Sequence, residues 1–186
     1  MVRFIISTGK WLQSWKLHWL LPLFKKKVRH LADNYRGIHL TPQLSKVTER
    51  ILASHLLPFL EKTGAYGDNQ FAYRSGHGYR DALAYLIFSW IWALGTGKRV
   101  GVFCSDVSGA FDRVSVDRLL RKLRARGVHE DLLNVLASWL DDRIGYVCVD
   151  GEFSNDFLLK NMIFQGTVLG PPLWNSTPMP MQPSRA

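Results

Sequence analysis

An aspartate follows an apolar stretch in the middle of the chain. The run Arg99 to Ser105 is predicted to form a buried strand, and Asp106 stands at its end. Strand ends hold side chains rigidly, and Mg²⁺ takes oxygen ligands from carboxylates, carbonyls and phosphates. Asp106 and the carbonyl of Val107 could therefore bind magnesium. Taken alone, however, Asp106 is better explained as an ordinary turn residue.

Two other segments carry residues suited to a nucleotide. Gln165 offers an amide that donates and accepts hydrogen bonds, and Gly166 allows a ligand to approach the backbone. Earlier in the chain, Lys25, Lys26 and Arg36 could hold phosphate oxygens. The simpler interpretations are an ordinary loop and a solvated basic strand. The run Lys25 to Arg29 also fits a nuclear import signal.

Composition supports a folded domain with an anionic partner. The chain has 186 residues, of which 47% are hydrophobic and 21% charged, so general disorder is excluded. Its net charge of +9 favours nucleic acid as the partner, with an anionic membrane second.

Cysteine usage and hydropathy bear on the compartment. Cys104 and Cys148 lie in apolar runs without metal-ligand spacing, which predicts buried free thiols in an intracellular, reducing setting, either nucleus or cytoplasm. Lys16 and His18 interrupt the apolar run Trp11 to Phe24. This run is therefore too short for a stable membrane span, and an amphipathic surface helix is the better alternative.

Periodicity predicts helices alternating with strands, which is an α+β (α/β-like) fold class. Thr41 is expected as a helix N-cap, with Pro42 as the first helical residue. The predicted helices cover 42–62, 81–94, 115–126 and 130–140. The predicted strands cover 35–40, 99–105, 144–149 and 157–164, with a hairpin-type turn at Asp150-Gly151. The proline-rich tail, residues 176–186, is predicted to be disordered.

Taken in order, several segments resemble the reverse transcriptases of non-LTR (LINE-type) retrotransposons over about Trp15 to Asn175. The matching blocks are Trp15-Lys16 with Pro22 to Lys26, Tyr35 to Ile38 with Leu44 to Arg50, Gln70 to Gly76 with Asp81 to Leu83, Asp106 to Val114, Ser138 to Arg143 with Val149 to Gly151, and Gln165 to Asn175.

The resemblance implies a right-hand polymerase with fingers at about 15–98 and part of the palm at about 99–175. Residues 1–14 would form an N-terminal segment and 176–186 a divergent tail. The family follows its Gln-Gly block with an aromatic-x-Asp-Asp hairpin, and nothing after Asn175 supplies one. The expected palm sheet is therefore incomplete, and the chain is expected to be truncated.

The resemblance also implies site roles. Asp106 would be the catalytic, metal-binding carboxylate, aided by the carbonyl of Val107. Nucleotide contacts would come from Lys25, Lys26, Arg36, Phe111, Gln165 and Gly166, with Phe111 beneath the sugar. Arg74 and Gly76 would border the template. The chemistry would be two-metal nucleotidyl transfer.

Some positions depart from the family pattern. Gly37 and Phe164 stand where proline is usual, and Asn161 replaces a glycine. Asp141-Asp142 superficially resembles the absent acidic hairpin, but it precedes Gln165 and ends a helical pattern, so we reject it.

The sequence therefore predicts a fragment of an RNA-directed DNA polymerase that does not polymerise alone and binds Mg²⁺ weakly or not at all. Its expected partners are RNA template, DNA primer and deoxynucleoside triphosphate, with an endonuclease or other element-encoded domains in a longer protein. The alternatives are a non-catalytic basic remnant that binds nucleic acid, for which the helix 115–126 is one candidate surface, and a small membrane-associated protein.

Overall fold

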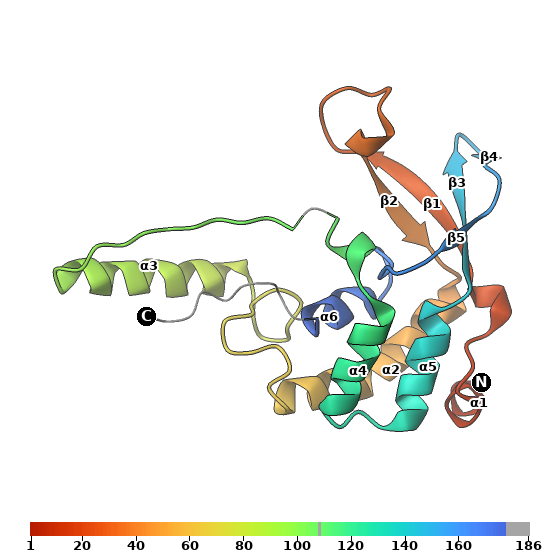
Figure 1. Ribbon diagram of the computed structural model, residues 1–186, viewed down its shortest axis with the longest axis horizontal. Coiled ribbons are helices and arrows are strands. Elements are labelled where there is room, and N and C mark those ends of the chain that lie inside the picture. Colours follow the sequence, from red (N-terminus) through yellow and green to blue (C-terminus); the bar gives the residue numbers. More distant parts are fainter. Residues whose placement is uncertain (108, 178–186) are drawn as a thin grey trace.

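An open mixed sheet lies against a group of packed helices in the computed structural model, which describes residues 1–107 and 109–177 (Figure 1). The strand order is β2-β1-β3-β4, with β5 also paired to β3. The strands are β1 (Leu17–Phe24), β2 (Tyr35–Leu40), β3 (Arg143–Val149), β4 (Glu152–Phe153) and β5 (Phe157–Leu159). The combination of helices and a partial mixed sheet confirms the α+β class.

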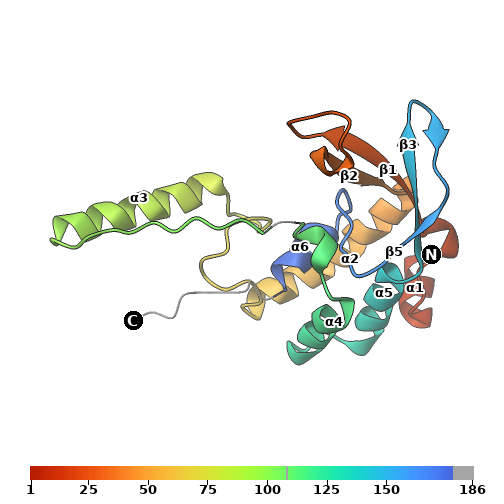
Figure 2. The same ribbon diagram turned by 45° about the horizontal axis from the view of Figure 1, so that its top comes forward.

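The helices form the second layer and also an arm that extends from it (Figure 2). They are α1 (Val2–Thr8), α2 (Gln43–Lys62), α3 (Tyr79–Gly95), α4 (Val116–Ala125), α5 (Glu130–Leu140) and α6 (Gly170–Asn175). Leucines of α2, α4 and α5 supply much of the core, including Leu56, Leu119 and Leu136, each at most 1% exposed. The burial of these apolar side chains is the main force that holds the helices together.

Elements with strong local signals form where they were predicted. Ser115 caps α4, because its hydroxyl accepts a hydrogen bond from the Arg118 amide at 3.4 Å. Asp150 and Gly151 adopt φ angles of 51° and 86° in the two-residue turn between β3 and β4. Positive φ at both positions is typical of the turns that join such short hairpins. The strand predicted over 157–164 ends early, at Leu159.

The predicted strand Arg99 to Ser105 is wrong. Residues 98–107 run without strand pairing, and Phe103 is 87% exposed. A strand needs hydrogen bonds from a neighbour, and no strand within 1–107 and 109–177 lies beside this segment. Cys104, expected to be buried, is therefore exposed, while Cys148 is half-buried.

The helix α3 forms as predicted, but its apolar side chains are not buried. None of its residues is buried, and Trp92 is 65% exposed. Both ribbon views show α3 and the segment that returns from it extending away from the rest of the molecule (Figures 1 and 2). The arm therefore adds little to the core.

The N-terminal region also differs from its predictions. Leu17–Phe24 forms β1, so the amphipathic surface helix considered as an alternative for this run is wrong. None of the helices described is long and apolar enough to cross a membrane. The first residues, for which no element was expected, form α1, and Ile5 and Trp11 are buried in the core. At the other end Ser176 is buried, and residues 178–186 lie outside the described part.

The first half of α2 buries polar residues. Leu44 and Val47, which are apolar, are 58% and 45% exposed, whereas the polar residues Thr48 and Glu49 are fully buried. Pro42 occupies the N-cap position in place of the predicted Thr41. The side of α2 that faces the rest of the molecule therefore carries buried polar residues, including Glu49, in its first half.

A hydrogen-bonded network of basic side chains lies between the sheet and α5. The Arg143 guanidinium donates to the carbonyls of Trp139 at 2.6 Å and Trp15 at 3.0 Å, and to Nε2 of His18 at 2.6 Å. His18 and His39 meet through their Nδ1 atoms at 3.0 Å. Because Nε2 of His18 accepts, its Nδ1 carries the proton and donates to His39.

Burial keeps both histidines neutral. Together with the nearby Arg143 charge, which is the smaller cause, burial lowers the pKa of His18 from 6.5 to about 2 and that of His39 to about 4. Burial also lowers the pKa of Arg143 to about 9. The core therefore holds a single guanidinium charge next to two uncharged imidazoles.

This network predicts a loss of stability in mild acid. The unfolded chain binds protons at these histidines near pH 6.5, whereas the folded chain does not until far lower pH. The free energy of unfolding is thus at its full value above about pH 6.5 and falls as the pH drops towards 4. Urea unfolding should show a loss of about 2 to 4 kcal/mol between pH 7 and pH 5.

The variant His39→Gln should reduce this dependence, whereas His55→Gln, at an exposed position of α2, should leave it unchanged. Equal stability at pH 7 and pH 5 in the unaltered chain would show that the buried histidines are not held neutral.

Candidate functional site

A cavity of about 780 Å³ opens where three distant segments meet. Its walls are the β1–β2 hairpin with its loop, the segment around Asp106 to Asp112, and the loop that begins near Gln165. The lining residues include Lys25, Lys26, Lys27, Asp33, Arg36, His39, Tyr73, Asp106, Val107, Phe111, Asp112, Met162 and Gln165. The volume is in the range of small-molecule sites, about 300–1,000 Å³.

The basic wall is built on an ordered hairpin loop. Asn34 is buried, and its side-chain Nδ2 donates to the Val28 carbonyl at 2.7 Å. Its main-chain carbonyl accepts from the Lys25 amide at 2.8 Å. The Tyr35 hydroxyl donates to the Arg29 carbonyl at 2.8 Å. These bonds fix the ends of the loop, so that the lysines project from a defined backbone.

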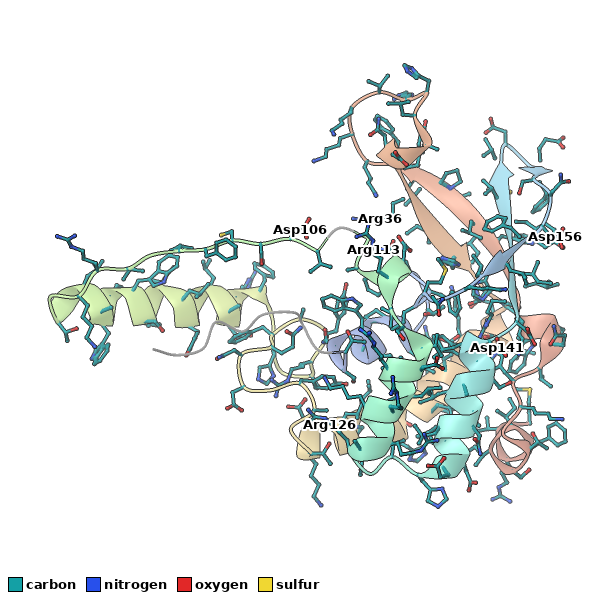
Figure 3. All side chains as sticks on the ribbon, in the orientation of Figure 1. Arg36, Asp106, Arg113, Arg126, Asp141 and Asp156 are labelled. Atoms are coloured by element: carbon teal, nitrogen blue, oxygen red, sulfur yellow. The ribbon has the colours of Figure 1, made fainter. Side chains whose placement is uncertain are left out.

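The acidic wall rests on a turn packed against α6. The Phe111 carbonyl accepts from the Ile163 amide at 2.8 Å, and its ring stacks on Trp174 with centroids 6.0 Å apart. Trp174 in turn donates to the Ala110 carbonyl at 3.0 Å. Asp106, by contrast, stands on an exposed extended segment and not at the end of a buried strand as predicted. Figure 3 labels Asp106 on this segment, and both Asp106 and Arg36 line the cavity.

The third wall is the loop that starts at Gln165. The Gln165 carbonyl accepts from the His39 amide at 2.8 Å, which joins this loop to β2. Gly166 has a φ of 99°, and a Cβ at this position would lie 2.9 Å from the His39 carbonyl oxygen. Glycine is therefore required for the loop to approach the strand this closely.

Charges of both signs line the cavity without pairing. Four cations, from Lys25 to Lys27 and Arg36, come from the hairpin, and three carboxylates also line the space. No salt bridge joins these groups within the part of the chain that the structure describes. The cations are thus available for phosphate oxygens and the carboxylates for a cation.

The residues present supply only part of a metal site. Among residues 1–107 and 109–177, no group of three or more His, Cys, Asp or Glu is placed to hold a metal ion. Asp106 and the carbonyl of Val107 offer the hard oxygens that divalent cations prefer, but they are too few for a complete coordination sphere.

Two residues expected at a template border lie outside the cavity. The Arg74 guanidinium pairs with Glu61 and also donates to the carbonyls of Gly67 at 2.7 Å and Gln70 at 2.9 Å. These bonds use Arg74 to order its own loop. Gly76 has a φ of 71° and no atom within 4 Å of where its Cβ would be.

Other acidic and basic groups lie elsewhere. Asp141 and Asp142 line a second cavity, of about 640 Å³, and Figure 3 shows Asp141 well apart from Asp106. On α4, Arg118 and Arg121 are exposed, but Arg124 pairs with Glu130. The basic face of α4 is therefore smaller than its sequence indicates.

The sequence did not single out several cavity residues. Tyr73 lines the space with a strained φ of 54°, and Asp33 and Asp112 add carboxylates. Tyr73 and Asp112 lie next to residues that were singled out, which is the one local signal available. Glu49 gave a subtler signal, because it falls with Leu52, Ala53 and Leu56 on one helical face.

Comparison with known proteins shows the family to which the chain belongs. Residues 24–181 match the family described as "Reverse transcriptase (RNA-dependent DNA polymerase)". The chain is 32% identical over 173 residues to the RNA-directed DNA polymerase from mobile element jockey of Drosophila melanogaster, covering 92% of this chain and 19% of that protein. It is 30% identical over 164 residues to the probable RNA-directed DNA polymerase from transposon BS of the same species, covering 88% and 18%.

A third relative is the retrovirus-related Pol polyprotein from type-1 retrotransposable element R2 of Popillia japonica, 33% identical over 79 residues, which cover 42% of this chain and 13% of the polyprotein. The chain thus spans about a fifth or less of the length of these relatives.

The close approach at Gly166 predicts a costly substitution. Gly166→Ala should destabilise the chain more than Gly67→Ala, which has a φ of 73° but open space around it. Both pay for positive φ, roughly 1–2 kcal/mol, and Gly166→Ala should lose about 2 kcal/mol more through overpacking against β2. Urea unfolding of the two variants measures the difference, and equal losses would mean that the loop does not pack on β2 as described.

Proposed function

We propose, from the premise that this chain belongs to the reverse transcriptase (RNA-dependent DNA polymerase) family, that its cavity binds the deoxynucleoside triphosphate of an RNA-directed DNA polymerase of the non-LTR retrotransposon type. One observation carries the proposal: the cations of the hairpin face Asp106 across a cavity that also contains Phe111 and Gln165. In our assignment the cavity lies between fingers (15–98) and partial palm (99–175).

Each wall has a chemical task in this proposal. Lys25, Lys26 and Arg36 neutralise the triphosphate, with Arg36 offering two parallel N–H donors. The stacked position of Phe111 suits a ring beneath the sugar, where a 2′-hydroxyl would be rejected. Gln165, with its main chain fixed on β2, keeps its side chain free to meet the nucleotide.

Reverse transcriptases use divalent metal ions, and we assign Asp106 and the Val107 carbonyl as ligands for Mg²⁺ because both are hard oxygen donors. When bound, the metal would neutralise charge on the phosphates. The described residues do not complete its coordination, so we derive no catalytic step from it. RNA template and DNA primer are the proposed macromolecular partners.

Nucleotide binding should depend on the hairpin cations. Binding of a fluorescent deoxynucleoside triphosphate in magnesium should weaken about tenfold or more in Arg36→Ala, because charge-assisted hydrogen bonds contribute about 1.5–3 kcal/mol. Arg121→Ala removes the same charge from an exposed position of α4 outside the cavity and should change affinity by less than about twofold. Equal losses in the two variants would favour a general charge effect and contradict the site.

Chain extension makes a separate prediction. The 186-residue polypeptide alone should show no template-dependent primer extension with magnesium, because Asp106 is the one carboxylate that we assign to the metal and it neutralises two divalent ions poorly. The assay compares the chain with Asp106→Asn at equal concentration. Extension by the unaltered chain that is lost in Asp106→Asn would overturn this prediction and show that the carboxylates described here suffice.

A further inference from the structure

The buried Glu49 of α2 is the clearest group for which the nucleotide site itself gives no role. Its carboxyl group is 0% exposed, and both oxygens accept hydrogen bonds. Oε2 accepts from the Val168 amide at 2.8 Å and from the Leu169 amide at 3.3 Å, while Oε1 accepts from the Ser45 hydroxyl at 3.2 Å. A carboxylate inside a core is costly unless its hydrogen bonds are satisfied, and here they are.

These contacts reach the loop that carries Gln165. The residues Val168 and Leu169 follow it by three and four positions and lead into α6, whose N-cap is Leu169. Both amides lie just before the first residue of α6, Gly170. Glu49 therefore anchors the far end of the loop on α2.

The near end of the same loop is anchored on β2. The Gln165 carbonyl accepts from the His39 amide, and Gly166 packs against the same residue. Between the two anchors, the Thr167 hydroxyl donates to the Phe164 carbonyl at 2.7 Å and accepts from the Gly170 amide at 3.2 Å. Gln165 thus belongs to a segment whose two ends are fixed to different elements.

We propose that Glu49 is a positioning residue for the nucleotide cavity, which holds Gln165 in place by binding the Val168 and Leu169 amides. The proposal rests on the proposed function of that cavity. Glu49 touches neither nucleotide nor metal, and it acts through the loop.

Hydrogen exchange of backbone amides tests the anchor without any nucleotide. In Glu49→Leu, which removes both acceptors, the Val168 and Leu169 amides should exchange about ten- to hundredfold faster, while α5 amides change little. Glu49→Gln keeps one acceptor oxygen and should give an intermediate increase. The matched control is Thr48→Val, which alters a neighbour on α2 that is also 0% exposed and whose hydroxyl has no hydrogen-bond partner in the described chain.

Binding of a fluorescent deoxynucleoside triphosphate then tests the consequence for the cavity. Glu49→Leu should lower affinity about tenfold, Glu49→Gln by less than about threefold, and Thr48→Val not at all. Faster exchange spread equally over α5 and the loop would reduce Glu49 to a purely structural role and overturn the proposal. If Glu49→Leu fails to fold, the same readouts in Glu49→Gln decide.

Two further outcomes separate this proposal from the proposed function. Local loosening of the loop with unchanged nucleotide affinity, while Arg36→Ala still weakens binding, would overturn the positioning role and leave the nucleotide site intact. Failure of the unaltered chain to bind the nucleotide at all would overturn the proposed function, and the positioning role with it. In that case hydrogen exchange would still show whether Glu49 anchors the loop.

Discussion

The hydrogen bond from the His39 amide to the Gln165 carbonyl joins two segments that are far apart in the sequence into one site. The strand β2 and the loop at Gln165 are separated by more than a hundred residues, and this bond fixes the start of the loop on the strand. The lysine hairpin is continuous with β2, and the turn at Phe111 bonds to Ile163 just before the loop. Once β2 and the loop are joined, the hairpin and this turn border the same space. The cavity thus depends on this strand-to-loop contact, together with the Glu49 anchor at the far end of the loop.

A buried charged side chain, Arg143, lies close to that contact. Arg143, His18 and His39 form a directional chain behind β2, and the Arg143 guanidinium lies 5.1 Å from the Phe164 ring, just before Gln165. Burying a guanidinium costs several kcal/mol, on the order of the whole stability of a small domain. Its three hydrogen bonds and its contacts with the Trp139 and Phe164 rings offset this cost only in this geometry, which restricts how Phe164 and the following loop can pack.

Local sequence signals were sufficient to predict much of the fold, whereas the pairing of distant segments could not be predicted from them. A capping serine at 115 and an Asp-Gly turn at 150 act within a few residues, so the sequence alone placed the elements that they border. The run from Arg99 to Ser105 has strand propensity but finds no partner strand in the described chain, and its exposure contradicts the prediction. For the site, the residues Lys25, Arg36, Asp106 and Gln165 were named by resemblance, and the structure brings them to one cavity. The supporting roles of Glu49 and His39 could not be predicted, because their partners lie far away in sequence.

The central claim is that this cavity, and not the general basic surface, receives a nucleotide. Photo-crosslinking with an azido-deoxynucleoside triphosphate, followed by peptide mapping, tests it most directly. The account predicts adducts on the peptides that contain Lys25 to Arg36 and Asp106 to Phe111, all lost in excess unlabelled nucleotide. Adducts concentrated on α4, or spread over the surface and resistant to competition, would contradict it.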